Sequence, residues 1–190
     1  MLNTLPGFVI RHWRPEDAPS LAHHANDRRV WLNMRDAFPH PYAVADAEAF
    51  LVRAASMVPV SYFAIAVGES AVGGIGYTLH GDVERVSAEI GYWLGTAFWG
   101  RGIMTSAVSA VTAHAFGAHP ELRRIYAVPF VENTASVRVL EKAGYQFEGR
   151  MRQSAIKDGK VIDQLLYAIL RSEPAGGIGP PGPPARRVSA

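Results

Sequence analysis

The stretch SAEIGYWLGTAFWGRGIMTSAV, residues 87–108, decides the fold of this chain. It predicts a strand that ends near Leu94, a short loop, and a helix that begins at Gly100-Arg101-Gly102. The first amides of a helix have no intrahelical partners, and the positive end of its dipole points outward. Two glycines there let the backbone curve around a diphosphate without interference from side chains. We therefore predict a phosphate-binding turn, to which Thr105 adds a hydroxyl and Arg101 a charge.

Two other interpretations of this turn stay open. It partly matches the G-x-G-x-x-G fingerprint of NAD(P)-binding oxidoreductases, with Glu132 as the acid that binds the ribose. However, Thr105 replaces the third glycine, the loop after Leu94 is long, and several strands precede a motif that normally opens its fold. The second alternative is an ordinary loop with glycine at a helix start, because short glycine motifs are weak evidence.

The rest of the chain predicts an α/β domain with a mixed sheet. Periodicity and turn residues indicate about seven strands, at residues 8–13, 61–67, 71–79, 87–94, 124–130, 145–156 and 161–170. Helices are expected at residues 15–26, 44–55, 103–116 and 133–143, with an irregular segment at 30–42. Gly68-Glu69-Ser70 and Asp158-Gly159 are typical of hairpin turns. This order favours a twisted sheet with helices on both faces.

Composition limits the classes of protein to consider. The chain has 190 residues, of which 48% are hydrophobic and 19% charged, the balance of a soluble globular protein. No apolar run approaches the roughly 18 residues of a membrane span, and no signal peptide is evident, so we expect a cytoplasmic protein without a membrane partner. The absence of cysteine removes disulfides, thiolate zinc sites and cysteine nucleophiles. The histidines lack ligand spacing, so we expect no metal site.

The small positive charge does not indicate a nucleic-acid partner. Lys and Arg number 19 against 17 Asp and Glu, and the segment from Pro174 onward holds Arg186 and Arg187 without an acid. The body is therefore formally neutral and lacks the basic face that binding to phosphate backbones requires. The same segment is rich in Pro and Gly, so we predict a domain over residues 1–171 and a flexible tail over residues 172–190.

Two motifs together resemble the acyl-CoA site of the GNAT superfamily of N-acetyltransferases. They are AEIGYWLG…WGRGIMTSA, within residues 88–107, and ENTASVRVLEKAGY, residues 132–145. The chain is most similar to the subgroup of ribosomal-protein N-terminal (alanine/serine) acetyltransferases, from Phe8 to about Leu170. The resemblance implies a GNAT-like, mostly antiparallel sheet. In such a sheet a bulge in strand 88–94 splays it from the parallel strand 124–130, making a V-shaped slot for pantetheine.

The resemblance also assigns residues to acetyl-CoA, the implied cosubstrate. Main-chain groups of Trp93 and Leu94 would pair with pantetheine, and Asn133 would contact the pantetheine arm besides capping its helix. The pyrophosphate would be held by amides of the turn, at Gly100, Arg101, Gly102, Ile103, Met104 and Thr105. The Gln or Arg usual in the family three residues before this turn is Ala97 here, a departure that amide binding tolerates.

Glu89 is the candidate general base, because transfer to an amine requires removal of a proton from it. A salt bridge to a neighbouring arginine would explain this glutamate equally simply. A main-chain N–H near Trp93 or Leu94 is the expected oxyanion donor. Ser136 shares a helix face with Asn133 and, by resemblance, donates to the leaving thiolate.

Two further positions concern the general acid. Many GNAT enzymes place a tyrosine acid where this chain has Leu140, which puts a tyrosine acid in doubt. We interpret Tyr145 as a packing residue.

The resulting hypothesis is acetyl transfer to a primary amine by direct attack in a ternary complex. The acceptor is a protein N-terminal α-amine or a small-molecule amine, and the chain is a monomer or a homodimer. A non-catalytic acyl-CoA-binding regulatory module is the alternative from another class. Trp31, Phe38 and Tyr42 either line the acceptor pocket or anchor their loop to the core.

Overall fold

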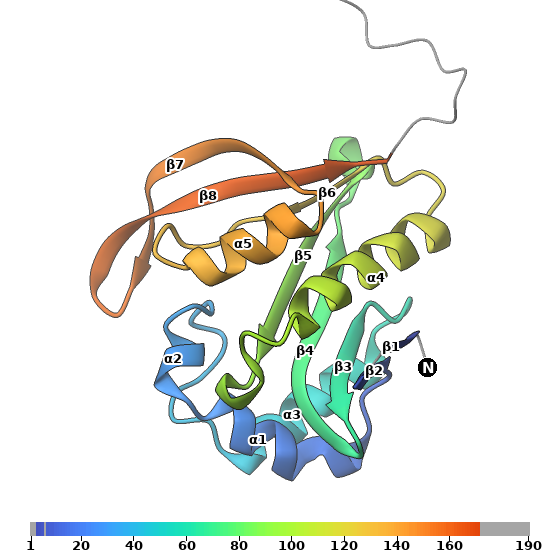
Figure 1. The fold of residues 1–190 in the computed structure, drawn as a ribbon, viewed down its shortest axis with the longest axis vertical. Helices are drawn as coiled ribbons and strands as arrows, with labels where there is room; N and C mark the ends of the chain where they lie inside the picture. The colour runs from blue at the N-terminus through green and yellow to red at the C-terminus, as the bar shows by residue number, and fades with distance from the viewer. Residues whose placement is uncertain (1–2, 6, 172–190) are drawn as a thin grey trace, which may run out of the picture.

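The computed structural model describes residues 3–5 and 7–171, which form an eight-stranded sheet covered by helices (Figure 1). The strand order is β1-β2-β3-β4-β5-β6-β8-β7. All neighbouring strands are antiparallel except β5 and β6, which are parallel. The strands are β1 Asn3–Leu5, β2 Phe8–Arg11, β3 Tyr62–Val67, β4 Ser70–Leu79, β5 Ser87–Leu94, β6 Arg124–Ala127, β7 Gln146–Lys157 and β8 Lys160–Leu170. The predicted tail, residues 172–190, lies outside the described residues.

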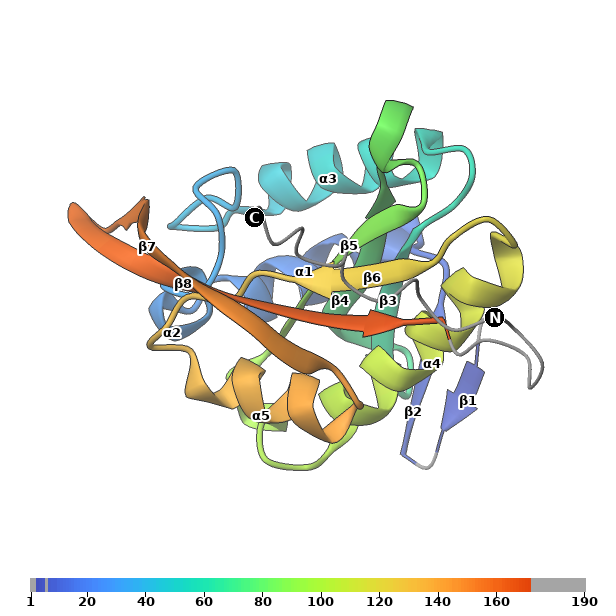
Figure 2. The same ribbon diagram turned by 90° about the horizontal axis from the view of Figure 1, so that it is seen from above.

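The helices cover both faces of the sheet, as predicted. Figure 2 shows α1 (Ala18–Ala25) and α3 (Val44–Ser56) on one face and α4 (Ile103–Ala118) and α5 (Thr134–Lys142) on the other. Three short 3-10 turns, Pro15–Asp17, Asp82–Glu84 and Thr96–Phe98, connect the elements. The segment 30–42, which we expected to be irregular, begins within α2 (Arg28–Trp31), a single turn capped by the Asp27 side chain. Four residues are too few for a helical period to appear in the sequence.

The sheet differs from the predicted one at its edge and at its centre. The additional strand is β1, three residues that pair with β2 and are too short to show alternation. Strand β6 ends at Ala127 rather than at Phe130, which makes only an isolated bridge to Gln164. Pro129 lies between these points and has no N–H to donate to a sheet ladder.

The early end of β6 creates the predicted splay. Parallel pairing with β5 is limited to Ser87–Glu89, whereas β5 continues to Leu94, so the two strands separate after Glu89. The bulge that the family resemblance implied in β5 is absent. The register with β4 is continuous from Ala88 to Leu94, and the irregularities lie in the β3–β4 and β7–β8 pairs.

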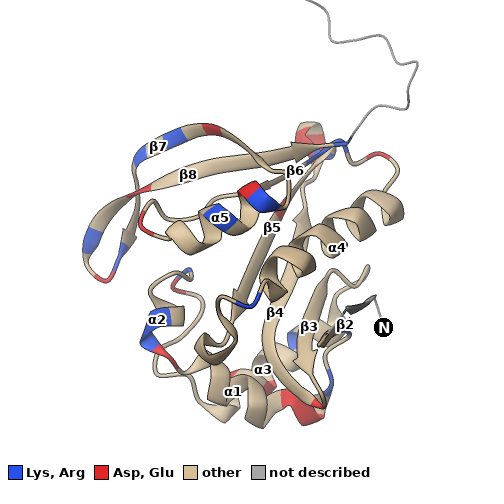
Figure 3. Ribbon diagram, viewed as in Figure 1, with Lys and Arg blue, Asp and Glu red and all other residues tan. Residues whose placement is uncertain are grey.

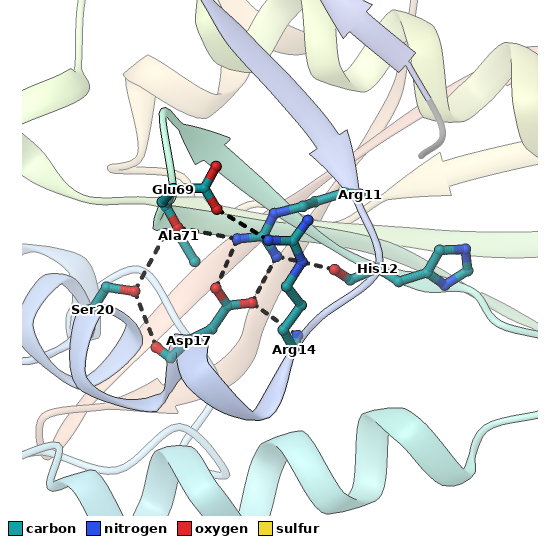
Figure 4. Close-up of polar contacts among 7 residues, drawn as sticks. All are labelled: Arg11, His12, Arg14, Asp17, Ser20, Glu69 and Ala71. Carbon is teal, nitrogen blue, oxygen red and sulfur yellow. Dashed lines mark hydrogen bonds and ion pairs between the residues drawn. The ribbon is translucent and has the colours of Figure 1, made fainter.

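A buried ion pair fixes the entry into α1 (Figure 4). The Arg11 guanidinium donates to both carboxylate oxygens of Asp17, at 2.7 Å each, and neither side chain is more than 6% exposed. The Arg14 main-chain N–H donates to the same carboxylate at 2.9 Å. Ser20 donates to the Asp17 carbonyl and accepts from the Ala71 N–H, which ties α1 to β4. This network anchors the α1 side of the sheet.

Candidate active site

A cavity of about 1180 Å³ opens where β5 and β6 separate. Its lining draws on β5, the turn before α4, the start of α5 and the segment between α2 and α3. The structure brings every predicted site residue to this one cavity: Glu89, Trp93, Leu94, Gly100, Arg101, Gly102, Ile103, Met104, Thr105, Asn133 and Ser136.

The turn before α4 requires glycine because of its backbone conformation. Gly100 and Gly102 have φ of +74° and +76°, which side-chain-bearing residues adopt at a cost. A Cβ atom at either position would meet open space, so steric crowding is not the reason. Gly102 is the N-cap residue, so α4 begins at Ile103, the first residue of the predicted helix.

The first amides of α4 are suited to an anion. The first hydrogen bond of this helix runs from the Ser106 N–H to the Gly102 carbonyl at 3.2 Å. The N–H groups of Ile103, Met104 and Thr105 therefore precede the helical ladder. They line the cavity at the positive end of a 16-residue helix, an arrangement that fits a diphosphate.

Two side chains stabilise the loop that leads into this turn. Trp99 donates its Nε1–H to the Leu94 carbonyl at 2.7 Å, so the indole ties the loop to the end of β5. The Arg101 guanidinium lies 5.3 Å from the centre of the Phe98 ring, at a cation–π distance. Both contacts involve residues that line the cavity.

The main-chain N–H and C=O groups of successive residues in β5 point alternately toward β4 and toward the β6 side. The Gly95 N–H donates to the Val72 carbonyl at 2.8 Å, and the uninterrupted register then directs the main-chain groups of Trp93 toward β4. Those of Tyr92 and Leu94 point to the side from which β6 has separated. The Trp93 main chain is thus already paired with Gly74. The groups open to a pantetheine arm are the N–H and C=O of Tyr92 and the N–H of Leu94, because the Leu94 carbonyl accepts from Trp99.

Glu89 lies at the last paired residue before the strands separate. Its side chain is 27% exposed and accepts a hydrogen bond from the Arg35 guanidinium, which is 70% exposed. The predicted salt bridge to an arginine is therefore present, and the position of Glu89 in the cavity leaves its role as a general base a prediction. Sequence analysis did not identify Arg35, which belongs to the segment between α2 and α3.

Trp31, Phe38 and Tyr42 were expected either to line the acceptor pocket or to anchor their loop. Phe38 and Tyr42 line the cavity and also pack, with ring centres 4.8 Å apart and Phe38 5.7 Å from the Trp93 ring. Trp31 lies elsewhere, with the Lys157 ammonium 3.8 Å from the centre of its ring. Lining and anchoring are thus combined in Phe38 and Tyr42, and Trp31 is an anchor.

A hydroxyl pair faces the cavity from the α5 side. The Asn133 Oδ1 accepts from the Ser136 N–H at 3.1 Å, which confirms Asn133 as the N-cap. The Ser136 and Tyr92 hydroxyls are 2.7 Å apart, and burial raises the pKa of Tyr92 well above its usual range. Tyr92 is the second residue that sequence analysis missed. The sequence did offer a signal for it: three residues after Glu89 in a strand, Tyr92 must point to the opposite face of the sheet, where α5 packs.

The two positions considered for a tyrosine acid, 140 and 145, both lie in the core. Leu140 is fully buried, and the Tyr145 hydroxyl shares a 2.7 Å hydrogen bond with Thr112 in the core. Within residues 3–5 and 7–171, no three His, Asp or Glu side chains are grouped as metal ligands. In the same part of the chain, every helix is too short or too polar to cross a bilayer.

The fold and the site together have the features of the GNAT class. Residues 8–146 match the family model described as an acetyltransferase (GNAT) domain, which covers most of the chain. The chain therefore belongs to the GNAT acetyltransferase family.

Three relatives illustrate its place there. An uncharacterized N-acetyltransferase, p20 of Bacillus licheniformis, is 35% identical over 60% of this chain and 64% of its own length. The ribosomal-protein-serine acetyltransferase of Escherichia coli (strain K12) is 35% identical over 43% of this chain and 45% of its own. Mycobacterium smegmatis RimJ, solved in complex with CoA-disulfide, is 28% identical with a TM-score of 0.74, covering 86% of this chain and 81% of that one. The chain thus spans about half to two thirds of these curated relatives' length.

Proposed function

We propose that the protein is an acetyl-CoA-dependent N-acetyltransferase that acts on a primary amine by direct attack in a ternary complex. One observation carries this proposal. A single cavity contains the amide-rich start of α4 and, where β5 and β6 separate, the carboxylate of Glu89. The first feature suits the diphosphate of coenzyme A, and the second suits removal of a proton from an amine.

Acetyl-CoA supplies an activated acetyl group when it is bound. The amides at the start of α4 hold its diphosphate, and the Asn133 amide and the free main-chain groups of Tyr92 hold its pantetheine arm. The Leu94 N–H serves as the donor to the oxygen on which negative charge develops.

Proton transfer completes the reaction. As the new C–N bond forms and the C–S bond breaks, the amine proton passes to Glu89, directly or through a water. The Tyr92–Ser136 hydroxyl pair donates to the departing thiolate. Arg35 donates to one carboxylate oxygen of Glu89, so the second oxygen receives the proton.

The acceptor that we propose is the α-amine of a protein N-terminus. The similarity to the ribosomal-protein-serine acetyltransferase of Escherichia coli supports this choice over a small-molecule amine. The proposed setting remains the cytoplasm.

The test is amine-dependent release of CoA from acetyl-CoA, measured with a thiol reagent against N-terminal peptides and small amines. We expect release with peptides and thermal stabilisation by acetyl-CoA. Binding of acetyl-CoA without turnover of any amine would instead favour the regulatory module. Stabilisation by NAD(P) and not by acetyl-CoA would favour the oxidoreductase.

A further inference from the structure

A second cavity of about 580 Å³ adjoins the first. Its walls come from β5, β6, β7, β8 and the segment between α2 and α3. The two cavities share part of their lining, namely Arg35, Glu89, Val128, Phe130 and Gln164. The ion pair between Arg35 and Glu89 therefore stands at the boundary between them.

Most of the charged groups around the smaller cavity already have partners in the protein. The Lys157 ammonium lies 2.8 Å from the Asp36 carboxylate. Arg124 donates to both carboxylate oxygens of Glu148, at 2.5 Å each. Glu84 is the exception: it also lines the cavity, is 73% exposed and has only His80 beside it, at 4.0 Å. Apart from this exposed acid, the pairings leave little uncompensated charge with which to attract a highly charged ligand.

The outer wall of the cavity is apolar and uncovered. Met151 and Ile156 belong to β7, line the cavity, and are 42% and 67% exposed. Phe130 and Leu166 continue this apolar surface on the neighbouring wall. Large apolar side chains exposed together around a cavity are typical of a surface that a ligand covers.

The wall is also held in place. The β7–β8 hairpin curves toward α2 (Figure 1), and Asp158 at its tip pairs with Arg28 at 2.5 Å. The next-door Lys157 is only 4% exposed, between Asp36 and the Trp31 ring. Figure 3 shows basic and acidic positions both at the tip of the β7–β8 hairpin and around α2. The buried Lys157 thus anchors this wall to the segment between α2 and α3, and the cavity volume falls within the usual range for binding pockets.

We propose that the 580 Å³ cavity selects the acceptor by binding a bulky apolar side chain from one of its first two residues. This inference rests on the proposed function, in which the acceptor amine lies at Glu89. Arg35 uses one N–H group on Glu89, and a guanidinium has five, so further donors face the acceptor's first carbonyl. In this arrangement the acceptor amine contacts Glu89 and its first carbonyl contacts Arg35. The apolar side chain packs against the apolar wall.

The same features disfavour a polyamine as the acceptor. A second ammonium group would need an acid to pair with. Asp36 is held by Lys157, and Glu84 is 73% exposed, so a pair with it would be screened by water and would contribute little. The exposed Met151 and Ile156 offer such a cation nothing but apolar surface.

The test compares peptides that are identical except for Phe, Leu, Gly or Glu at the first or the second position. Wild type is expected to show kcat/KM at least about 10-fold higher for Phe or Leu than for Gly at one of these positions, the discrimination that apolar pockets achieve. Met151→Ala and Ile156→Ala should each lower kcat/KM for the Phe peptide more than for the Gly peptide, so that the ratio narrows several-fold. Phe147→Ala is the matched control, because Phe147 lies on β7, is 55% exposed and lines neither cavity.

The failures of the two proposals are distinguishable. If wild type acetylates all peptides equally, or if Met151→Ala and Ile156→Ala keep the wild-type ratio while melting at the wild-type temperature, the pocket is wrong and N-acetylation stands. If wild type releases CoA with no peptide or amine, the proposed function fails and the pocket with it. A higher kcat/KM for a polyamine than for any peptide would also overturn the pocket.

Discussion

Two arginine–carboxylate pairs in this protein have the same chemistry and opposite settings. Arg11 and Asp17 are at most 6% exposed, make two 2.7 Å hydrogen bonds, and lie in a network with main-chain groups. Arg35 and Glu89 are 70% and 27% exposed and share one hydrogen bond at the boundary of two cavities. The difference is in how readily each pair can change partners.

Solvent access explains this difference. A buried pair cannot be broken without leaving an uncompensated charge away from water, whereas an exposed pair can exchange its partner at little cost. The Arg11–Asp17 pair is thus suited to stabilising the fold, and the Arg35–Glu89 pair to contacting a substrate.

The largest effect on stability is expected from Asp17→Asn. The Arg11 guanidinium would stay buried without its counter-charge, so we expect the free energy of unfolding to fall by about 3–5 kcal/mol. Chemical denaturation measures this loss. Glu69→Gln is the control, because its pair with Arg14 is 93% exposed at Glu69 and should contribute about 1 kcal/mol or less. Equal losses from both variants would remove the distinction between the two settings.

The second effect concerns the strained turn on the active-site side. Gly102→Ala places a side chain at φ of +76°, at a cost of about 1–2 kcal/mol. If the turn grips acetyl-CoA, that cost should weaken its binding by roughly 10-fold, as measured by isothermal titration. Gly117→Ala, at the other end of α4 and with open space around it, is the matched control and should bind normally. Unchanged affinity in Gly102→Ala would argue against the amide cradle.

Arg35→Ala should give a smaller effect of a different kind. The exposed pair contributes about 1 kcal/mol or less to folding, so the melting temperature should barely change. The KM for a peptide acceptor should rise several-fold, since a donor to its first carbonyl is lost, while the KM for acetyl-CoA stays the same. A large loss of stability would place this pair in the same class as Arg11 and Asp17.

The smallest expected effect is that of salt. Raising the ionic strength from about 0.01 to 0.15 M shortens the Debye length from about 30 to about 8 Å and screens exposed charges far more than buried ones. The acceptor KM should therefore respond more to salt in wild type than in Arg35→Ala. If both proteins respond alike, screening of the pair between Arg35 and Glu89 is not involved.

Local sequence patterns were sufficient to predict most of the fold. Alternation and helical spacing indicated seven of the eight strands and four of the helices, and Asp158-Gly159 marked the last hairpin, where both residues have positive φ. The patterns failed for β1 and α2, which are shorter than one detectable period. They also failed to locate the end of β6, which depends on where Pro129 falls relative to the sheet.

Individual residues of the candidate site could be predicted from the sequence, but the side chains that contact them could not. Motifs indicated the turn at Gly100 and Gly102, Glu89 and Ser136, and their assigned roles stay predictions. The partners Arg35 and Tyr92 were missed because each pairing spans a large sequence separation, 54 residues to Glu89 and 44 to Ser136. No local period encodes contacts of that range.

The most direct test of the central claim is amine-dependent release of CoA by Glu89→Gln, measured beside the affinity for acetyl-CoA. Glutamine keeps the size of the side chain and removes its basicity, so we expect kcat to fall by about 10²- to 10⁴-fold with the affinity and the melting temperature unchanged. A kcat within a few-fold of wild type at neutral pH would contradict the account, because the carboxylate at the opening of the strands would then have no part in the transfer.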